Sequence, residues 1–469
     1  MPRGELAIVL HAHMPYVEGF GTWPFGEEWL WEATATSYVP LLRVLDGIGS
    51  DASRAKLSLS LTPVLCDQLE APRAMERCIA FLREIRPESH RRDIEGFRRA
   101  GDTAAVAELE RSAAEYEAAA DALERFERDG GLMQALGRHA SWTSAATHAI
   151  LPLLVLDDSI ELQLRVGIDS YRRRFGEWGG GFWLPECAYA PWLNTALLEA
   201  GIRATCVELT GLLGHGGDLN LSPRKPHDGP TLLPIDRAVI DLVWGAEGYP
   251  SRPAYRDSHR RTLHDHHVWT NDGGIYDPDR ARRQAAEDAR AFVQAVRDRL
   301  AKNGGLCVCA LDAELLGHWW YEGPQWLESV LAEAEHQGVT LAALDVETLA
   351  RHPPIETEGH EHSAATSWGA GGDLRTWSAP SVADLVWTAR RAELHAFLHG
   401  GGTPSQRALR ELLALQSSDW AFLAHREWAG DYPRQRASGH AAQLIRALKG
   451  ETDTPYVGNL APYLERSYS

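Results

Sequence analysis

The chain has 469 residues, and its 47 Lys plus Arg against 65 Asp plus Glu give a formal net charge of −18. Such an acidic protein repels phosphate backbones and anionic lipid, which argues against nucleic acid or membrane partners. With 44% hydrophobic and 24% charged residues the chain is not disordered, and its length fits about three average domains or one α/β barrel with additions. Its 17 tryptophans are unusually many, and such rings either fill a core or stack on sugars.

The first three quarters of the chain alternate short apolar runs with helical stretches. The apolar runs predict strands at residues 5–10, 56–62, 140–147, 180–187, 202–209, 238–245 and 305–312. Strands that alternate with helices indicate a parallel sheet, and this many favour a closed or nearly closed barrel.

Three other segments have a different composition. Residues from about 70 to 140 are rich in Ala, Glu and Arg at helical spacing, which predicts a helical insertion. Residues 352–375 are rich in Gly, His and Pro and predict a long functional loop. The pattern is helical from about residue 380. We therefore predict a barrel over 1–375 and a C-terminal helical domain over 376–469.

The cysteines and the N-terminus indicate the compartment. Six cysteines in so long a chain, without a C-x-x-C pair, predict neither a disulfide framework nor a structural zinc ribbon. The apolar run before His11 is too short for a signal peptide, and no segment approaches the length of a membrane span. We expect a cytoplasmic protein.

Polar residues follow several of the predicted strands. In α/β barrels the active site lies at the carboxyl ends of the strands, so these residues are the candidates for chemistry. They are His11, His13, His148, Glu186, Asp312 and Glu314. Tryptophans lie close to the acidic candidates in sequence, namely Trp183, Trp319 and Trp320.

Three functions fit this set of residues. A carboxyl pair can cleave a glycosidic bond, with one group attacking the anomeric carbon while the other protonates the leaving oxygen. A His-x-His pair with further ligands can hold zinc in a metal-dependent hydrolase or deacetylase. A glucan-binding protein without activity could keep the aromatic residues, although it has no need of two neighbouring carboxyls. The surplus of tryptophan favours a sugar substrate, and the residues alone do not distinguish Asp312 from Glu314.

Several motifs, taken in order, resemble the conserved regions of glycoside hydrolase family 57, and within it the α-1,4-glucan branching enzymes. They are HAHMPYVEG, SWTSAATHAILPLL, GGFWLPECAY, ALDAELLGHWWYEGP, SWGAGGDLRTW and ELLALQSSDWAF. The resemblance implies an α/β fold, an incomplete (β/α)7 barrel with a helical insertion and a C-terminal helical domain. It also implies a retaining mechanism, with α-glucan polysaccharide or maltooligosaccharide as substrate and no cofactor or metal.

The resemblance assigns roles by position in the motifs. It implies that Glu186 of WLPE is the nucleophile and that Asp312, which opens DAELLGHWW, is the general acid/base. It implies substrate binding by further residues, which are His11, His13, His148, Trp183, Trp319, Trp368, Trp377, Asp419 and Trp420.

One segment departs from the family pattern. The branching enzymes carry a long tyrosine-bearing loop over the cleft, whereas residues 193–243 contain no Phe, Tyr or Trp and the loop is shortened. We therefore expect a branching-enzyme-like protein with weak branching and raised hydrolysis, or a purely hydrolytic α-1,4-glucanase of the same family. A histidine cluster at 259–267 could suggest a metal, but its irregular spacing favours a solvated loop.

Overall fold

The computed structural model describes residues 4–47, 56–357, 364–398, 404–451 and 456–464. Its strands are β1 (Glu5–Ala12), β2 (Ser58–Leu61), β3 (Ala140–Ser144), β4 (Gly181–Trp183), β5 (Ala204–Val207), β6 (Arg224–Pro226), β7 (Thr231–Pro234), β8 (Leu306–Asp312), β9 (Thr340–Leu341) and β10 (Ile355–Thr357). They form one sheet in the order β10-β6-β7-β5-β4-β3-β2-β1-β8, with β9 on β1. All pairs are parallel except β6 with β7.

This sheet curls into an incomplete barrel. β1 lies between β2 and the edge strand β8 and is buried along its whole length, which explains why ELAIVLHA is apolar on both faces. After β7 the chain approaches the far edge of the sheet, where Asp236 donates its backbone N–H to Val308 of β8 over 2.9 Å. The predicted α/β fold with an incomplete barrel and a C-terminal helical region is confirmed.

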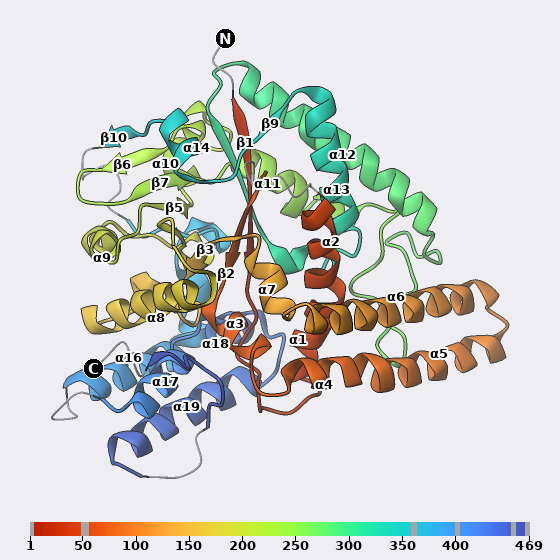
Figure 1. Cartoon of the computed structure of the whole chain (residues 1–469), viewed down its shortest axis with the longest axis horizontal. Coiled ribbons are helices and arrows are strands. Elements are labelled where there is room, and N and C mark those ends of the chain that lie inside the picture. The colour runs from red at the N-terminus through yellow and green to blue at the C-terminus, as the bar shows by residue number, and fades with distance from the viewer. Residues whose placement is uncertain (1–3, 48–55, 358–363, 399–403, 452–455, 465–469) are drawn as a thin grey trace.

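Helices surround the sheet and extend from it (Figure 1). Those of the first half are α1 (Glu27–Ala33), α2 (Val39–Gly47), α3 (Pro63–Leu69), α4 (Ala74–Ala80), α5 (Arg86–Ala100), α6 (Thr103–Arg128), α7 (Leu132–Gly137), α8 (Asp157–Phe175) and α9 (Asn194–Glu199). A π-helical turn, Thr34–Tyr38, joins α1 to α2. Figure 1 shows α5 and α6 as a long hairpin that projects away from the sheet, within the segment expected to be a helical insertion.

The second half adds the remaining helices. They are α10 (Thr210–Leu213), α11 (Arg237–Trp244), α12 (Pro278–Ala301), α13 (Gly323–Gln337), α14 (Val346–Arg351), α15 (Arg375–Ser378), α16 (Ala383–Leu398), α17 (Gln406–Leu415), α18 (Ser418–Arg426) and α19 (Tyr432–Leu448). Helices α16 to α19 gather at one end of the molecule (Figure 1). They share a hydrophobic cluster with Leu162 and Val166 of α8, so the C-terminal helices pack directly on the barrel.

The strand predicted at 238–245 is wrong, because this segment is helix α11. Val239, Ile240 and Val243 are buried, which is helical spacing, while Trp244 is exposed. Asp236 caps the helix by accepting from the N–H of Ala238. The strand of this region is instead the four-residue β7, whose apolar run is too short to be recognised by periodicity.

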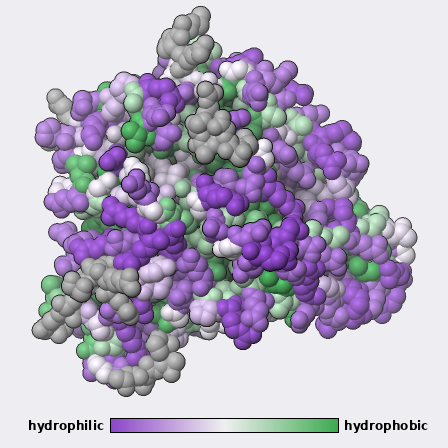
Figure 2. Space-filling model, in the orientation of Figure 1, coloured by the Kyte–Doolittle hydropathy of each residue, from purple (hydrophilic) through white to green (hydrophobic). Residues whose placement is uncertain are grey.

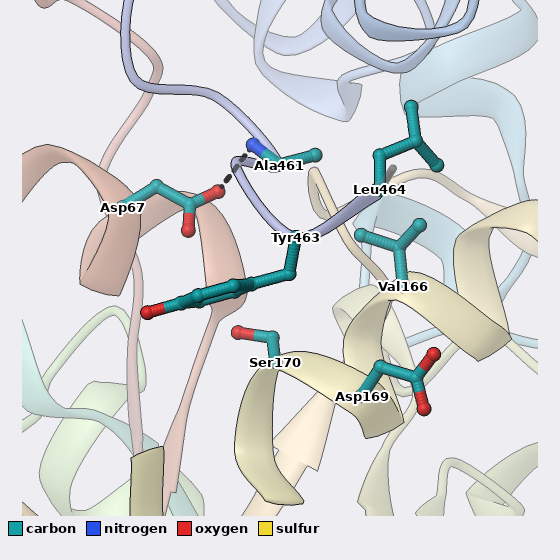
Figure 3. A pocket seen from close by; sticks show the side chains of 7 residues that line it. All are labelled: Asp67, Val166, Asp169, Ser170, Ala461, Tyr463 and Leu464. Carbon is teal, nitrogen blue, oxygen red and sulfur yellow. Dashed lines mark hydrogen bonds between the residues drawn. The ribbon is translucent and has the colours of Figure 1, made fainter. Parts of the chain in front are cut away.

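The C-terminal segment lies against the barrel helices (Figure 3). Asp67 of α3 accepts a hydrogen bond from the N–H of Ala461 over 2.8 Å and forms an ion pair with Arg174 of α8 over 2.6 Å. Figure 3 shows Tyr463 between α3 and α8, and the Arg174 guanidinium lies 5.2 Å from the centre of its ring. The small pocket at this place is lined by none of the residues predicted for the site.

Hydrophilic residues cover most of the face seen in Figure 2, including the α5–α6 hairpin. Across the part of the chain that the structure describes, no helix combines the length and the apolar character needed to cross a membrane.

Candidate active site

The carboxyl ends of parallel strands bring the predicted site residues to one edge of the sheet. His11 lies near the end of β1 and is paired in register with Asp312, the last residue of β8. His148 follows β3, and Glu186 follows β4. Because neighbouring parallel strands end at the same edge, residues from four separate parts of the sequence meet there.

Four flat rings form a continuous stack at this edge. Trp183 stacks on His11 with ring centres 4.5 Å apart and planes at 9°. His11 lies 5.1 Å from His148, which in turn lies 4.0 Å from His13. Burial holds the pKa of His11 and of His148 well below the ordinary histidine value, so both rings are neutral. A neutral imidazole offers one donor and one acceptor nitrogen.

Three buried nitrogens in this stack are free to bind a ligand. Within the described residues, Nε2 of His11, Nε2 of His148 and Nε1 of Trp183 have no hydrogen-bond partner. Buried polar atoms are almost always paired in folded proteins. Donors and acceptors of this kind suit the hydroxyl groups of a bound sugar.

Helix α18 supplies partners to two of the histidines from the C-terminal part of the chain. Ser418 Oγ lies 2.8 Å from Nδ1 of His148. The two carboxylate oxygens of Asp419 lie 3.0 and 3.2 Å from Nε2 of His13. Nδ1 of His13 lies 3.3 Å from Oγ1 of Thr62. The Asp419 carboxylate therefore contacts the His13 ring and orients it.

Glu186 stands on a strained turn directly after β4. Its φ is 60° and that of Cys187 is 49°, a left-handed conformation that costs energy for residues with a side chain. The indole N–H of Trp368 donates to Glu186 Oε2 over 2.6 Å, and the backbone N–H of Trp368 donates to the Glu186 carbonyl over 3.0 Å. The loop that carries Trp368 thus holds Glu186 by both its side chain and its backbone.

Three carboxyl groups influence one another at this edge. Burial, with the nearby charge of Asp312, raises the pKa of Glu186 to about 8, while the Trp368 N–H opposes this rise. Desolvation by the surrounding protein and the charge of Glu314 raise the pKa of Asp312 to about 7, and His13 opposes that rise. Asp312 is exposed at the site, so water limits the effect on its carboxyl. Carboxyl groups that are coupled by charge in this way do not titrate independently.

Asp312 and Glu314 occupy different environments although they are two residues apart. The Glu314 side chain is buried, and its Oε1 accepts from the Tyr38 hydroxyl over 2.5 Å and from the backbone N–H of His13 over 3.0 Å. Asp312 is exposed and accepts no hydrogen bond from a described side chain. The Asp312 carboxyl is therefore the one that is open to a reacting molecule.

The predicted tryptophans divide into two groups. Trp319 is 47% exposed, and Trp368 is half-buried beside Glu186. Trp183 is fully buried beneath His11. Trp377 is buried in a cluster with Ile150, and Trp420 packs in the core of the C-terminal helices. The last two rings are each only 2% exposed, and substrate binding by Trp377 or Trp420 stays a prediction.

Several residues of this region were not predicted from the sequence. Trp428 is exposed, and its ring centre lies 6.2 Å from that of Trp319. Ser418 is a neighbour of the predicted Asp419, and that adjacency was the signal available. Tyr38 lies on the π-helical turn, far from Glu314 in the sequence, and no motif marks it.

The histidine cluster at 259–267 is not a simple solvated loop. His259 is exposed, but His266 is buried and its Nδ1 lies 2.7 Å from Oδ2 of Asp93 in α5. Its ring lies 3.8 Å from that of His90, so the loop is attached to the helical hairpin. Within the described part of the chain, no three or more His, Cys, Asp or Glu side chains are arranged to hold a metal ion.

Comparisons with known proteins point to one family. The family model described as glycosyl hydrolase family 57 matches residues 132–357, and the model described as 1,4-alpha-glucan branching enzyme, C-terminal, matches residues 402–457. A probable 1,4-alpha-glucan branching enzyme of Mycobacterium tuberculosis is 31% identical over 93% of this chain and 90% of its own length.

Two archaeal proteins show the same likeness. The 1,4-alpha-glucan branching enzyme of Thermococcus kodakarensis is 30% identical, with 98% of this chain and 76% of the relative covered. The crystal structure of a branching enzyme of this family from Pyrococcus horikoshii superposes with a TM-score of 0.84 at 30% identity, covering 98% of this chain and 94% of that one.

Proposed function

The chain belongs to glycoside hydrolase family 57, and we propose from this membership that it is a retaining 1,4-α-glucan branching enzyme whose catalytic carboxyl groups are Glu186 and Asp312. The observation that carries the proposal is the likeness to branching enzymes over both the barrel and the C-terminal helices. The neighbouring carboxyls at the strand ends supply the groups that such a reaction requires.

In the first half of the reaction, Glu186 attacks the anomeric carbon of an α-1,4-linked glucose. The bond to the leaving O4 breaks, and Asp312 gives its proton to that oxygen. Two interactions favour this division of roles: the Trp368 N–H donates to Glu186 and stabilises its anion, and the charge of Glu314 disfavours an anionic Asp312. The proposed roles require an ionised Glu186 and a protonated Asp312 when the reaction begins.

In the second half, Asp312 is a carboxylate and acts as a base. It takes the proton from the 6-hydroxyl of an acceptor glucan, whose oxygen attacks the anomeric carbon and releases Glu186. The product is an α-1,6 branch. Water can take the place of the acceptor, and the same step then completes a hydrolysis.

We expect the neutral imidazoles of His11 and His148 to bind the hydroxyls of the sugar at the cleavage point. Their Nε2 atoms are buried and unpaired within the described residues. Asp419 fixes the orientation of the His13 ring, and Ser418 fixes that of His148. Trp319, half exposed beside Trp428, provides apolar area for further glucose rings of the chain.

One observation favours a larger share of hydrolysis than in longer relatives. The alignment with the Thermococcus kodakarensis enzyme extends over 532 residues, so this chain of 469 lacks segments that the relative has. After β5, residues 208–222 form only α10 and a short 3₁₀ turn, and they contain no Phe, Tyr or Trp. Transfer exceeds hydrolysis only where a site excludes water and holds the acceptor in place.

Incubation with amylose tests the proposal. New α-1,6 linkages and new reducing ends are counted in the same reaction, with Glu186→Gln as the inactive control. Branches formed by the wild type and not by the variant support a branching enzyme. Reducing ends without branches would reassign the protein as a hydrolytic α-1,4-glucanase, and no change in the amylose would refute both.

A further inference from the structure

Glu314 is a buried carboxyl group that the two-carboxylate reaction does not use. It lies on the short 3₁₀ turn Ala313–Leu315, directly after Asp312. Its backbone carbonyl accepts from the N–H of Trp319 over 3.1 Å, so the turn is also fixed on its other side. An ionisable group placed so close to a reacting carboxyl is costly to bury and requires a physical explanation.

Burial raises the pKa of Glu314 to about 7, and two hydrogen bonds oppose that rise by favouring the carboxylate. Both groups that donate to it, the Tyr38 hydroxyl and the His13 N–H, are uncharged. Such donors stabilise a carboxylate. Among the described residues, no Arg, Lys or His side chain forms an ion pair with Glu314. When Glu314 is a carboxylate, no described ion pair neutralises it, and its charge acts on the groups beside it.

Asp312 is the group that lies beside it, and the charges around Asp312 come from several elements. Glu186, after β4, is a second carboxyl near it. His13, after β1, opposes them, and its ring is bound to Asp419 of α18. His11, its register partner on β1, is neutral.

We propose that Glu314 is a positioning residue that keeps the proton on Asp312 until the leaving oxygen takes it. The inference rests on the proposed function, because it assumes that Asp312 is the general acid. Glu314 acts by charge and not by contact with substrate: a carboxylate held by Tyr38 and the His13 backbone disfavours a second negative charge on Asp312. The hydrogen bond from the His13 backbone N–H to Glu314 also fixes the backbone of His13.

The sign of the effect follows from the role of the acid. The alkaline limb of kcat/KM for cleavage of a maltooligosaccharide reports loss of the Asp312 proton. Glu314→Gln removes the charge and keeps a carbonyl oxygen for the Tyr38 and His13 donors. We expect the alkaline limb to move to lower pH by about one unit. Glu314→Asp retains the charge, so its limb stays near the wild-type position even if kcat falls.

A matched control separates charge from structure. Ser37 Oγ donates to the Ala313 carbonyl over 2.9 Å, so Ser37→Ala loosens the same turn without changing any charge. We expect it to lower kcat without moving the limb. A second substrate, α-maltosyl fluoride, leaves as fluoride and needs no proton from Asp312. The wild type and Glu314→Gln should therefore show the same alkaline behaviour with it.

Two results would overturn the inference. One is an unshifted limb in a folded, active Glu314→Gln enzyme, and the other is an equal shift in Ser37→Ala. A shift of the same size with α-maltosyl fluoride would likewise show that the Asp312 proton is not what Glu314 controls. If the wild type does not cleave α-1,4-glucan at all, it is the proposed function that fails.

Discussion

Replacing Trp368 by Phe tests whether this residue acts through its N–H or through its ring. The substitution keeps an aromatic face for a sugar and removes the 2.6 Å hydrogen bond to Glu186 Oε2. A hydrogen bond to a charged group contributes about 1.5–3 kcal/mol, which corresponds to a pKa rise of about one to two units for Glu186. Because Glu186 must be ionised to attack, we expect the acidic limb of kcat/KM to move to higher pH.

The rate should fall together with this shift. At a pH below the new limb, kcat/KM for maltooligosaccharide cleavage should drop about 10- to 100-fold. Trp178→Phe is the matched control, since it removes an indole N–H that donates to the Gly181 carbonyl over 2.9 Å, outside the site. If Trp368→Phe raises only KM and leaves the acidic limb in place, Trp368 is a stacking platform and the assigned hydrogen bond does not control Glu186.

Four further predictions concern the same molecule. Glu186→Gln should abolish turnover and keep glucan binding, because an amide cannot form the glycosyl ester; turnover within about tenfold of wild type would contradict its role. Asp312→Asn should lose most activity on unactivated glucan yet cleave α-maltosyl fluoride to the glycosyl-enzyme, which a burst of fluoride release would detect. Dialysis against a strong chelator should leave cleavage unchanged, whereas activity restored by zinc would favour a metal-dependent hydrolase. Burial lowers the pKa of His90 to about 4 in the folded protein. As the pH falls, this histidine is protonated in the unfolded chain before it is protonated in the folded one, so the free energy of unfolding should fall between about pH 6.5 and 4. His90→Gln should make that fall smaller in denaturant titrations at a series of pH values.

An element could be predicted from the sequence where a long run of apolar residues determines its structure. β1 and β8 are buried on both faces and could be recognised from apolar runs alone. The strand ends then identified Glu186, Asp312 and the histidines as neighbours. Periodicity failed at 238–245, where buried Val and Ile suit a strand as well as a helix and only the Asp236 cap distinguishes them.

The distribution of hydrogen bonds could not be predicted from the sequence. Tyr38 reaches Glu314 only because the π-helical turn packs against the loop after β8. The tryptophans were equally ambiguous, since an indole in a sugar site and an indole in a core look the same in a sequence. Trp420 illustrates this, because its N–H is already taken by the Ala414 carbonyl over 2.8 Å. Contacts between distant segments, rather than motifs, decide these cases.

The C-terminal helices are part of the candidate site itself. Ser418 and Asp419 begin α18 and contact two histidines that stand at strand ends of the barrel. Histidine rings that stack 4.0 Å apart can still turn about their own axes, and polar partners at their edges remove that freedom. The helices that present these partners are packed on α8 and share its hydrophobic cluster. A barrel without them would keep both carboxyls but lose the orientation of the histidine rings that we expect to bind the sugar.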